Sequence, residues 1–195
     1  LDIGMLSDIF EHIDEKPAAE YLDEMDVRKA AKILSSMETD AVIDVLKMIP
    51  KEKRALLIEL TDADTREDIA VIASFDDEEI GSRMTTNFIM IRENLTVKQA
   101  MSSLVEQAAK NDNISTIYVV DEQDKYYGAI DLKDLIVARD TDTLESIISR
   151  SYPYLLDNEK TDDCVDRIKE YAEDSLPVLT QEGKIAGIIT SSDVV

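Results

Sequence analysis

Two stretches of the chain carry the same seven-residue pattern, GAIDLKD at residues 128–134 and GIITSSD at residues 187–193. Each pattern ends an apolar segment and begins a helix-like one. The apolar pair Val119-Val120 also recurs 59 residues later as Val178-Leu179, at the same separation as the two patterns. A sequence pattern repeated at one separation indicates a duplicated structural unit. We therefore predict two copies of a β-α-β-β-α unit in the second part of the chain.

The segments on either side of the two patterns fit such a unit. In the first copy we expect strands at Phe88–Ile91, Ser115–Val120 and Tyr127–Ile130, with helices at Thr96–Ala109 and Asp131–Ala138. In the second copy we expect a helix at Thr161–Glu173, strands at Ser175–Leu179 and Lys184–Ile189, and a last helix from Thr190. Short apolar runs bounded by turn residues are typical of buried strands, and a Thr before a periodic segment is typical of a helix N-cap.

Residues 1–80 follow another period and read as helix throughout. Apolar pairs recur every 12 residues, at Leu22-x-x-Met25, Leu34-x-x-Met37, Leu46-x-x-Ile49 and, with Thr in the last place, Ile58-x-x-Thr61. A residue suited to beginning a helix follows each one: Asp26, Glu38, Pro50 and Asp62. Helices of eight to ten residues are marginal alone, so we predict a stack of short helices whose Leu and Met stripe forms the core. The fold class is thus multidomain α and α/β, with an all-helical N-terminal stack followed by the duplicated unit.

Charge narrows the set of partners. The chain has 43 Asp and Glu against 21 Lys and Arg, a net charge of −22. Such a surface is repelled by nucleic acid and by anionic lipid, so no nucleic-acid partner and no direct lipid binding are expected. Its natural partners are cations or a basic protein face, although acidity that serves only solubility is the plainer alternative.

Neither catalysis nor a transition-metal site finds support in the sequence. Cys164, in a predicted helix, is the only cysteine and is most simply a small core residue, and His12 is the only histidine. No nucleophile–base–acid set and no glycine-rich phosphate loop is present, so we expect a protein that is not an enzyme. The lone cysteine fits a reducing compartment, and without 18 consecutive apolar residues the chain is expected to be soluble.

The repeated pattern resembles the CBS domain, named after cystathionine β-synthase, whose signature is a strand, Gly, two apolar residues, Ser or Thr, two variable residues and Asp. The second copy matches this signature with Thr190 and Asp193, whereas the first has Asp131 in the place of the Ser or Thr. The stretch Phe75–Thr86, an acidic run followed by a small-residue step and Met-Thr, is similar to the segment that leads into the CBS pair of MgtE-type magnesium transporters. The helical stack resembles that family's N domain.

This resemblance implies an organisation and a function. Residues 1–80 would form an MgtE N-type domain, 81–142 the first CBS repeat, and 143–195 the second, cut within its C-terminal helix. It implies a cytosolic homodimer at the cytoplasmic face of the cell membrane, joined in the full-length protein to a membrane-embedded transporter domain. It also implies that Mg²⁺ binding closes the module and inhibits transport. The coordination chemistry of Mg²⁺ is consistent with this function. Mg²⁺ prefers oxygen ligands and keeps several waters, so one or two carboxylates from each acidic face are enough to bind it.

Family position and local pattern select the candidate Mg²⁺ ligands. They are Glu38, Asp40 and Asp44 in the helical part, Asp140, Asp142 and Glu145 in the linker after the first repeat, and Asp157, Glu159 and Asp193 in the second repeat. Asp40 and Asp44 lie at i, i+4 and share a helix face. For each of them a solvated surface position is the alternative. We interpret the run Asp76–Glu79 as a hydrated linker.

An adenylate such as ATP is the second ligand to weigh. In CBS pairs the signature Asp can hold ribose hydroxyls and the Ser or Thr side can approach phosphate, which implies a site made of Lys133, Asp134, Thr190 and Asp193. Asp131 argues against it, because a carboxylate repels phosphate unless a metal intervenes. Thr190 needs no ligand if it only caps the last helix. Three functions therefore stay open: a Mg²⁺ sensor, an adenylate-sensing CBS module without a Mg²⁺ role, and a constitutive dimerisation scaffold.

Overall fold

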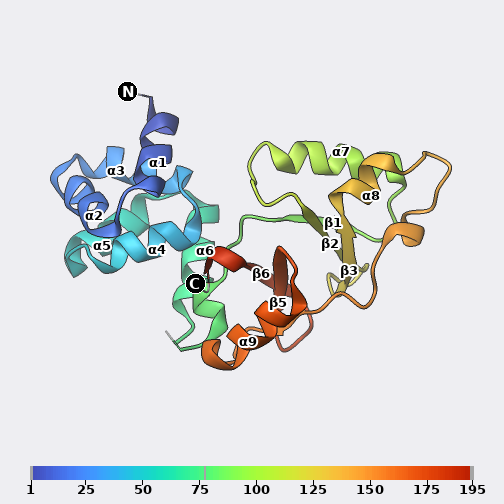
Figure 1. The fold of residues 1–195 in the computed structure, drawn as a ribbon. Coiled ribbons are helices and arrows are strands. Elements are labelled where there is room, and N and C mark those ends of the chain that lie inside the picture. The colour runs from blue at the N-terminus through green and yellow to red at the C-terminus, as the bar shows by residue number, and fades with distance from the viewer. Residues whose placement is uncertain (1, 77, 194–195) are drawn as a thin grey trace. The chain divides into compact units, whose positions relative to one another are not determined.

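The computed structural model describes residues 2–76 and 78–193, and the chain divides into two compact units, Leu1–Phe75 and Asp76–Val195 (Figure 1). Each unit is described by itself. Among the described residues, no helix is long and apolar enough to cross a membrane.

The first unit is a stack of short helices. They are α1 (Ile3–His12), α2 (Glu15–Glu24), α3 (Val27–Ser36), α4 (Thr39–Lys47), α5 (Lys51–Leu60) and α6 (Ala63–Ala73). Helices two apart in sequence pack together, with α3 between α1 and α5 and α4 between α2 and α6 (Figure 1). Of the apolar residues predicted to form the core, Leu22, Leu34, Met37, Leu46 and Ile49 are buried, whereas Met25 and Ile58 are only partly buried. The predicted helical stack is confirmed.

The 12-residue period marks the helix starts. Asp26, Glu38, Pro50 and Asp62 occupy the N-cap positions of α3, α4, α5 and α6, as predicted. The Asp62 carboxylate accepts a hydrogen bond of 2.8 Å from the backbone N–H of Thr65. Hydrogen bonds from Thr65 lower the pKa of Asp62, because a charged acceptor is stabilised by the unpaired N–H groups of the first turn. The helix starts therefore recur at the repeat period, and the side chains of Asp26 and Asp62 cap two of these helices.

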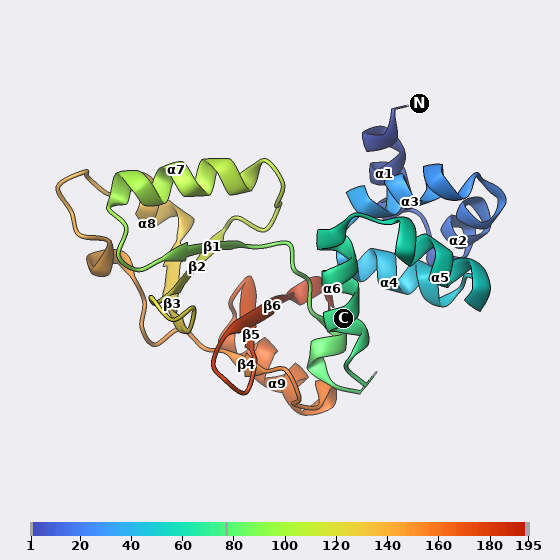
Figure 2. The ribbon, with the colours of Figure 1, turned by 180° about the vertical axis from the view of Figure 1, so that it is seen from behind.

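The second unit contains two three-stranded sheets. The first is built from β1 (Ile89–Arg92), β2 (Thr116–Val120) and β3 (Tyr126–Asp131), with α7 (Val97–Ala108) and α8 (Leu132–Val137). The second is built from β4 (Leu155–Leu156), β5 (Ser175–Leu179) and β6 (Ile185–Thr190), with α9 (Thr161–Tyr171). The 3₁₀ turns are Ile80–Arg83, Leu144–Ile147 and Ser191–Asp193. Figure 2 shows α7 and α8 on the same face of the first sheet.

The two sheets have one topology. In each, the first strand pairs parallel with the second and the second pairs antiparallel with the third. The register shifts at Val119/Val120 in the first sheet and at Val178/Leu179 in the second, which are the residues that repeat in sequence. The duplicated unit is thus confirmed. The sequence pattern predicts no strand at β4, which has only two residues.

The signature glycines let a distant segment cross each sheet. A Cβ on Gly128 would lie 2.5 Å from the carbonyl oxygen of Ser149, and a Cβ on Gly187 would lie 2.8 Å from that of Thr85. The next residue in each strand bridges to the same segment, Ala129 to Ser149 and Ile188 to Thr85. The segment before the second sheet, at Ser149, therefore crosses the first sheet, and the segment before the first sheet, at Thr85, crosses the second. These crossings hold the two repeats together.

A buried aromatic cluster lies between the two sheets. Tyr118 of β2 packs with Ala129 and with Ile188 of the other sheet, and its ring meets Tyr152 edge to face at 6.1 Å. The Tyr118 and Ser175 hydroxyls are 2.6 Å apart and share a hydrogen bond. Burial raises the pKa of Tyr118 far above its usual range, so the hydroxyl stays neutral and serves as a hydrogen-bonding group.

Candidate metal and nucleotide sites

Two of the carboxylates on α4 that are predicted to bind Mg²⁺ line a pocket of about 590 Å³. Asp40 and Asp44 are half-buried, one helical turn apart, and both line this pocket, as the i, i+4 spacing predicts. Asp44 also lies 4.0 Å from the ammonium of Lys47. Glu38 is the N-cap residue of α4, and its side chain does not cap the helix.

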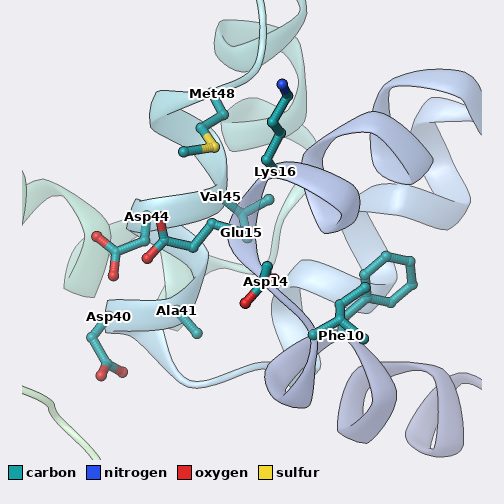
Figure 3. A pocket seen from close by; sticks show the side chains of 10 residues that line it. Phe10, Asp14, Glu15, Lys16, Asp40, Ala41, Asp44, Val45 and Met48 are labelled. Carbon is teal, nitrogen blue, oxygen red and sulfur yellow. The ribbon is translucent and has the colours of Figure 1, made fainter.

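The opposite wall of the pocket is also acidic, which the sequence does not reveal. Asp14 is the N-cap residue of α2, without a capping hydrogen bond from its side chain, and Glu15 is the first residue of the helix. Both line the pocket with Asp40 and Asp44. In Figure 3 the Glu15 side chain extends from α2 toward α4. These acids are 24 or more residues from α4 in sequence, and no local pattern connects the two helices. The pocket floor is apolar, with contributions from Phe10 and Val45.

The linker after the first repeat does not gather its three acids. The Asp142 carboxylate accepts a 2.8 Å hydrogen bond from the backbone N–H of Arg139, whereas Asp140 is exposed. Glu145 accepts a 2.8 Å hydrogen bond from the Tyr127 hydroxyl, and this bond raises the pKa of Tyr127. The guanidinium of Arg150 lies over the same ring, 3.5 Å from its centroid. Glu145 therefore has a structural role in joining the linker to β3.

Asp157 and Glu159 lie in the turn after β4. The Glu159 carboxylate accepts a hydrogen bond of 2.8 Å from the backbone N–H of Leu156 and one of 2.5 Å from the guanidinium of Arg167. Both of its oxygens therefore already have protein partners. The Asp157 carboxylate is 3.4 Å from the side-chain amide of Gln181. The backbone of this turn also binds the segment that leads into the first repeat. The carbonyl oxygens of Asp157 and Glu159 accept hydrogen bonds from the backbone N–H groups of Gly81 and Ile80, respectively.

The acidic run at 76–79 is more than a hydrated linker. The carbonyl oxygen of Glu78 accepts a 2.8 Å hydrogen bond from Thr161, and Glu79 bridges to Lys160. These backbone contacts attach the run to the second repeat. Asp77 lies outside the described residues.

The predicted nucleotide residues differ between the repeats. In the second, the Asp193 carboxylate lies 2.7 Å from both the backbone nitrogen and the hydroxyl of Thr190, which donate to it. Burial raises the pKa of Asp193, and the bonds from Thr190 act in the opposite direction. In the first repeat, Lys133 and Asp134 are exposed on α8, and Asp131 caps that helix by accepting from the N–H of Lys133 at 2.8 Å.

Across residues 2–76 and 78–193, no group of three or more Asp, Glu, His or Cys side chains is arranged to hold a metal ion. The lone cysteine is buried in α9, as predicted, and burial raises the pKa of its thiol to about 11. His12 is exposed, with its ring 2.7 Å from the carbonyl oxygen of Asp8.

Comparison with known families and proteins agrees with the two-unit fold. The family described as the MgtE intracellular N domain matches residues 1–78, and the CBS domain matches residues 78–140 and 144–195. The magnesium transporter MgtE of Thermus thermophilus is 29% identical over 191 residues, which cover 96% of this chain and 42% of that protein. The magnesium transporter MgtE of Enterococcus faecalis is 32% identical over 128 residues, which cover 66% and 28%. The chain thus spans less than half of these relatives.

Two solved structures match over the whole chain. The soluble part of a magnesium transporter is 31% identical with a TM-score of 0.93, and the match covers 77% of that structure. The cytosolic domain of the Mg²⁺ channel MgtE in complex with ATP is 28% identical with a TM-score of 0.90, and the match covers 79% of it.

Proposed function

Because the chain belongs to the MgtE family, as an MgtE intracellular N domain followed by a pair of CBS domains, we propose that it is a Mg²⁺-sensing regulatory module of a magnesium transporter. The module would be non-catalytic and lie at the cytoplasmic face of the membrane, attached to the transporter domain of the full-length protein. Mg²⁺ binding would favour a closed arrangement of its two units and inhibit transport.

The observation on which this proposal rests is the pocket that Asp40 and Asp44 share with Asp14 and Glu15. Carboxylates on facing helices repel one another, and a divalent cation between them removes the repulsion. Mg²⁺ retains several waters, so it needs only one or two protein carboxylates from a unit, and the remaining ligands can be waters or a second acidic face. This is consistent with the finding that, among the described residues, no three acids are placed to hold one metal ion by themselves.

Mg²⁺ would act by shifting a population. A ligand moves a two-state equilibrium only as far as its affinities for the two states differ. The open state keeps acidic faces of a chain with a net charge of −22 apart, and the closed state needs cations between them. Mg²⁺ therefore favours the closed state. Of the other predicted acids, Asp140 and Asp157 are the better candidates for such bridging, because Glu145 and Glu159 are committed to protein partners.

The CBS pair offers a face for the expected homodimer. Val105 of α7 and Ile136 and Val137 of α8 are 65%, 61% and 67% exposed, although all three are apolar. These helices pack on the same side of the first sheet (Figure 2). Exposed apolar side chains on two helices that pack together are typical of a protein interface. We therefore place the dimer contact on α7 and α8.

Small-angle scattering with thermal melting tests the sensor. The chain is titrated with Mg²⁺, with Na⁺ at matched ionic strength as the control. A smaller radius of gyration and a higher melting temperature with Mg²⁺ than with Na⁺ are expected. Equal responses to the two salts would reject Mg²⁺ sensing by this chain.

Adenylate binding is the second candidate, because the related cytosolic MgtE domain was solved in complex with ATP. Lys133, Asp134, Thr190 and Asp193 are the residues proposed for it. ATP is added in a separate arm of the same titration. Stabilisation by ATP alone, without a Mg²⁺ effect, would favour an adenylate-sensing module, and a response to neither would favour a dimerisation scaffold.

A further inference from the structure

A second pocket extends the first one along the same pair of helices. It has a volume of about 350 Å³ and is lined by Lys16, Ala19, Glu20, Asp23, Met48 and Pro50. Lys16 and Met48 also line the first pocket, so the two pockets meet at these side chains. Figure 3 shows both residues at one end of the first pocket. We call the combined feature the α2–α4 groove.

The groove follows matching stripes of the two helices. On α2 the stripe is Glu15, Lys16, Ala19, Glu20 and Asp23, and on α4 with its C-cap it is Asp40, Ala41, Asp44, Val45 and Met48. Both have the spacing i, i+1, i+4, i+5, i+8, which keeps residues on one helix face. Eight residues rise about 12 Å, so the groove is long enough for roughly two turns of helix.

The groove combines an apolar floor with acidic rims. Val45 and Ala19 form part of the floor and are 3% and 4% exposed, whereas Met48 is 51% exposed. A thioether side chain that is half in water is an adaptable contact for an apolar group. The rims carry six carboxylates, and Lys16 lines both pockets. Lys47 lies 4.0 Å from the Asp44 carboxylate, and Lys53 lies 3.4 Å from that of Asp23.

We propose that the α2–α4 groove is a docking site for a basic, amphipathic polypeptide segment. One apolar side chain of the segment would pack on Met48 and the floor, and Lys or Arg residues on its flanks would meet the carboxylates of both rims. Charge complementarity selects this partner, because the acidic rims repel an acidic or anionic ligand and an uncharged apolar helix gains no ion pair from them. Amphipathic helices bind grooves of this kind through anchors one turn apart. The groove includes the pocket proposed for Mg²⁺, but docking of the segment does not require Mg²⁺.

The test uses the full chain without Mg²⁺, in buffer containing EDTA. The probe is a fluorescent 12-residue helical peptide with Leu on one face and Lys and Arg on its flanks, with a scrambled peptide of the same composition as reference. Anisotropy measures affinity, and amide chemical shifts locate the peptide. We expect saturable binding at least about tenfold tighter than that of the scrambled peptide, with shifts in α2 and α4.

Variants distinguish binding in the groove from nonspecific attraction to the acidic surface. Glu20→Lys with Asp23→Lys is expected to weaken binding about tenfold or more through charge reversal, and Met48→Ser several-fold through loss of the apolar anchor. Glu59→Lys with Glu67→Lys is the matched control: both residues are exposed in the same unit, and neither lines either pocket. Circular dichroism verifies that each variant is folded.

Specific outcomes would overturn the proposal. They are equal affinity for ordered and scrambled peptides, an equal loss in the control variant, or shifts outside α2 and α4. Displacement of the peptide by spermine at equal charge concentration would also overturn it, because it would show a site for small cations. The Mg²⁺ titration of the Glu20→Lys, Asp23→Lys variant keeps the two hypotheses apart: neither residue lines the pocket that Asp40 and Asp44 share, so loss of peptide binding with an intact Mg²⁺ response leaves the sensor proposal standing.

Discussion

The two CBS repeats share a backbone but use their signature positions differently. Both have the same strand order, the same register shift and a glycine that admits a crossing segment. Asp131 of the first repeat is exposed and caps its own helix, whereas Thr190, its counterpart, donates to a half-buried Asp193. Duplication has preserved the residues that the fold needs and has let the polar chemistry diverge. Substitutions at the shared backbone features should therefore affect the stability of both repeats, whereas substitutions at the polar signature residues should affect the two repeats differently.

The largest change in the free energy of unfolding is expected at the signature glycines, where a crossing segment lies closest to the sheet. Gly128→Ala places a Cβ 2.5 Å from a backbone oxygen, whereas in Gly187→Ala the backbone oxygen is 2.8 Å away and the other near atoms belong to the flexible Met84. We expect Gly128→Ala to lower the free energy of unfolding by about 3 kcal/mol and Gly187→Ala by about 1–2 kcal/mol. Urea unfolding measures both. Equal and negligible losses would show that the crossing segments are not held as described.

A smaller effect is expected from the hydrogen bond between the sheets. Ser175→Ala leaves the buried Tyr118 hydroxyl without its 2.6 Å partner and should cost about 2 kcal/mol. Adding Tyr118→Phe removes the orphaned hydroxyl, so the double variant should recover most of that loss. If the double variant loses as much as the two single variants together, the two hydroxyls do not act as a pair.

The smallest effect concerns pH and separates the two signature acids. Burial raises the pKa of Asp193, so the folded chain holds a proton where the unfolded chain has released it. This contribution favours the folded state at low pH and is lost as pH rises from the ordinary Asp value through the raised pKa. Asp193→Asn should remove that part of the pH dependence of unfolding.

Asp134→Asn is the matched variant, because Asp134 is the counterpart of Asp193 and is exposed. It should leave the pH dependence of the free energy of unfolding closer to that of the parent chain than Asp193→Asn does. Guanidinium unfolding at several pH values between 3 and 7 provides the comparison. The same curve for both variants would mean that Asp193 is not buried differently from its counterpart.

Local patterns predicted much of this fold because local chemistry specifies it. Asp26 and Asp62 cap helices through bonds to N–H groups two or three residues away, and Thr96 forms a capping box with Gln99. The duplicated glycine and the apolar pairs lie at one separation, which is visible in sequence. Such features need no knowledge of the rest of the chain.

The candidate sites were harder to predict because they depend on contacts between distant segments. The pairing of Asp14 and Glu15 with α4 arises from helix stacking, which places residues about 25 apart in sequence at one pocket. Conversely, nothing near Glu159 indicates that Arg167, one repeat element later, takes its carboxylate. A single sequence shows which residues are acidic, and only packing shows which of them face a shared space.

The central hypothesis, Mg²⁺ sensing through the acidic pocket of the helical unit, is tested most directly by the Mg²⁺-induced shift in melting temperature. The shift is compared between the parent chain, Asp40→Asn with Asp44→Asn, and the control Glu59→Gln with Glu67→Gln, each against Na⁺ at matched ionic strength. If Mg²⁺ binds at the pocket, the first pair should lose most of the Mg²⁺-specific shift while the control retains it. An undiminished shift in the Asp40, Asp44 variant, or an equal decrease in both variants, would contradict the hypothesis and indicate that Mg²⁺ only screens a highly acidic chain.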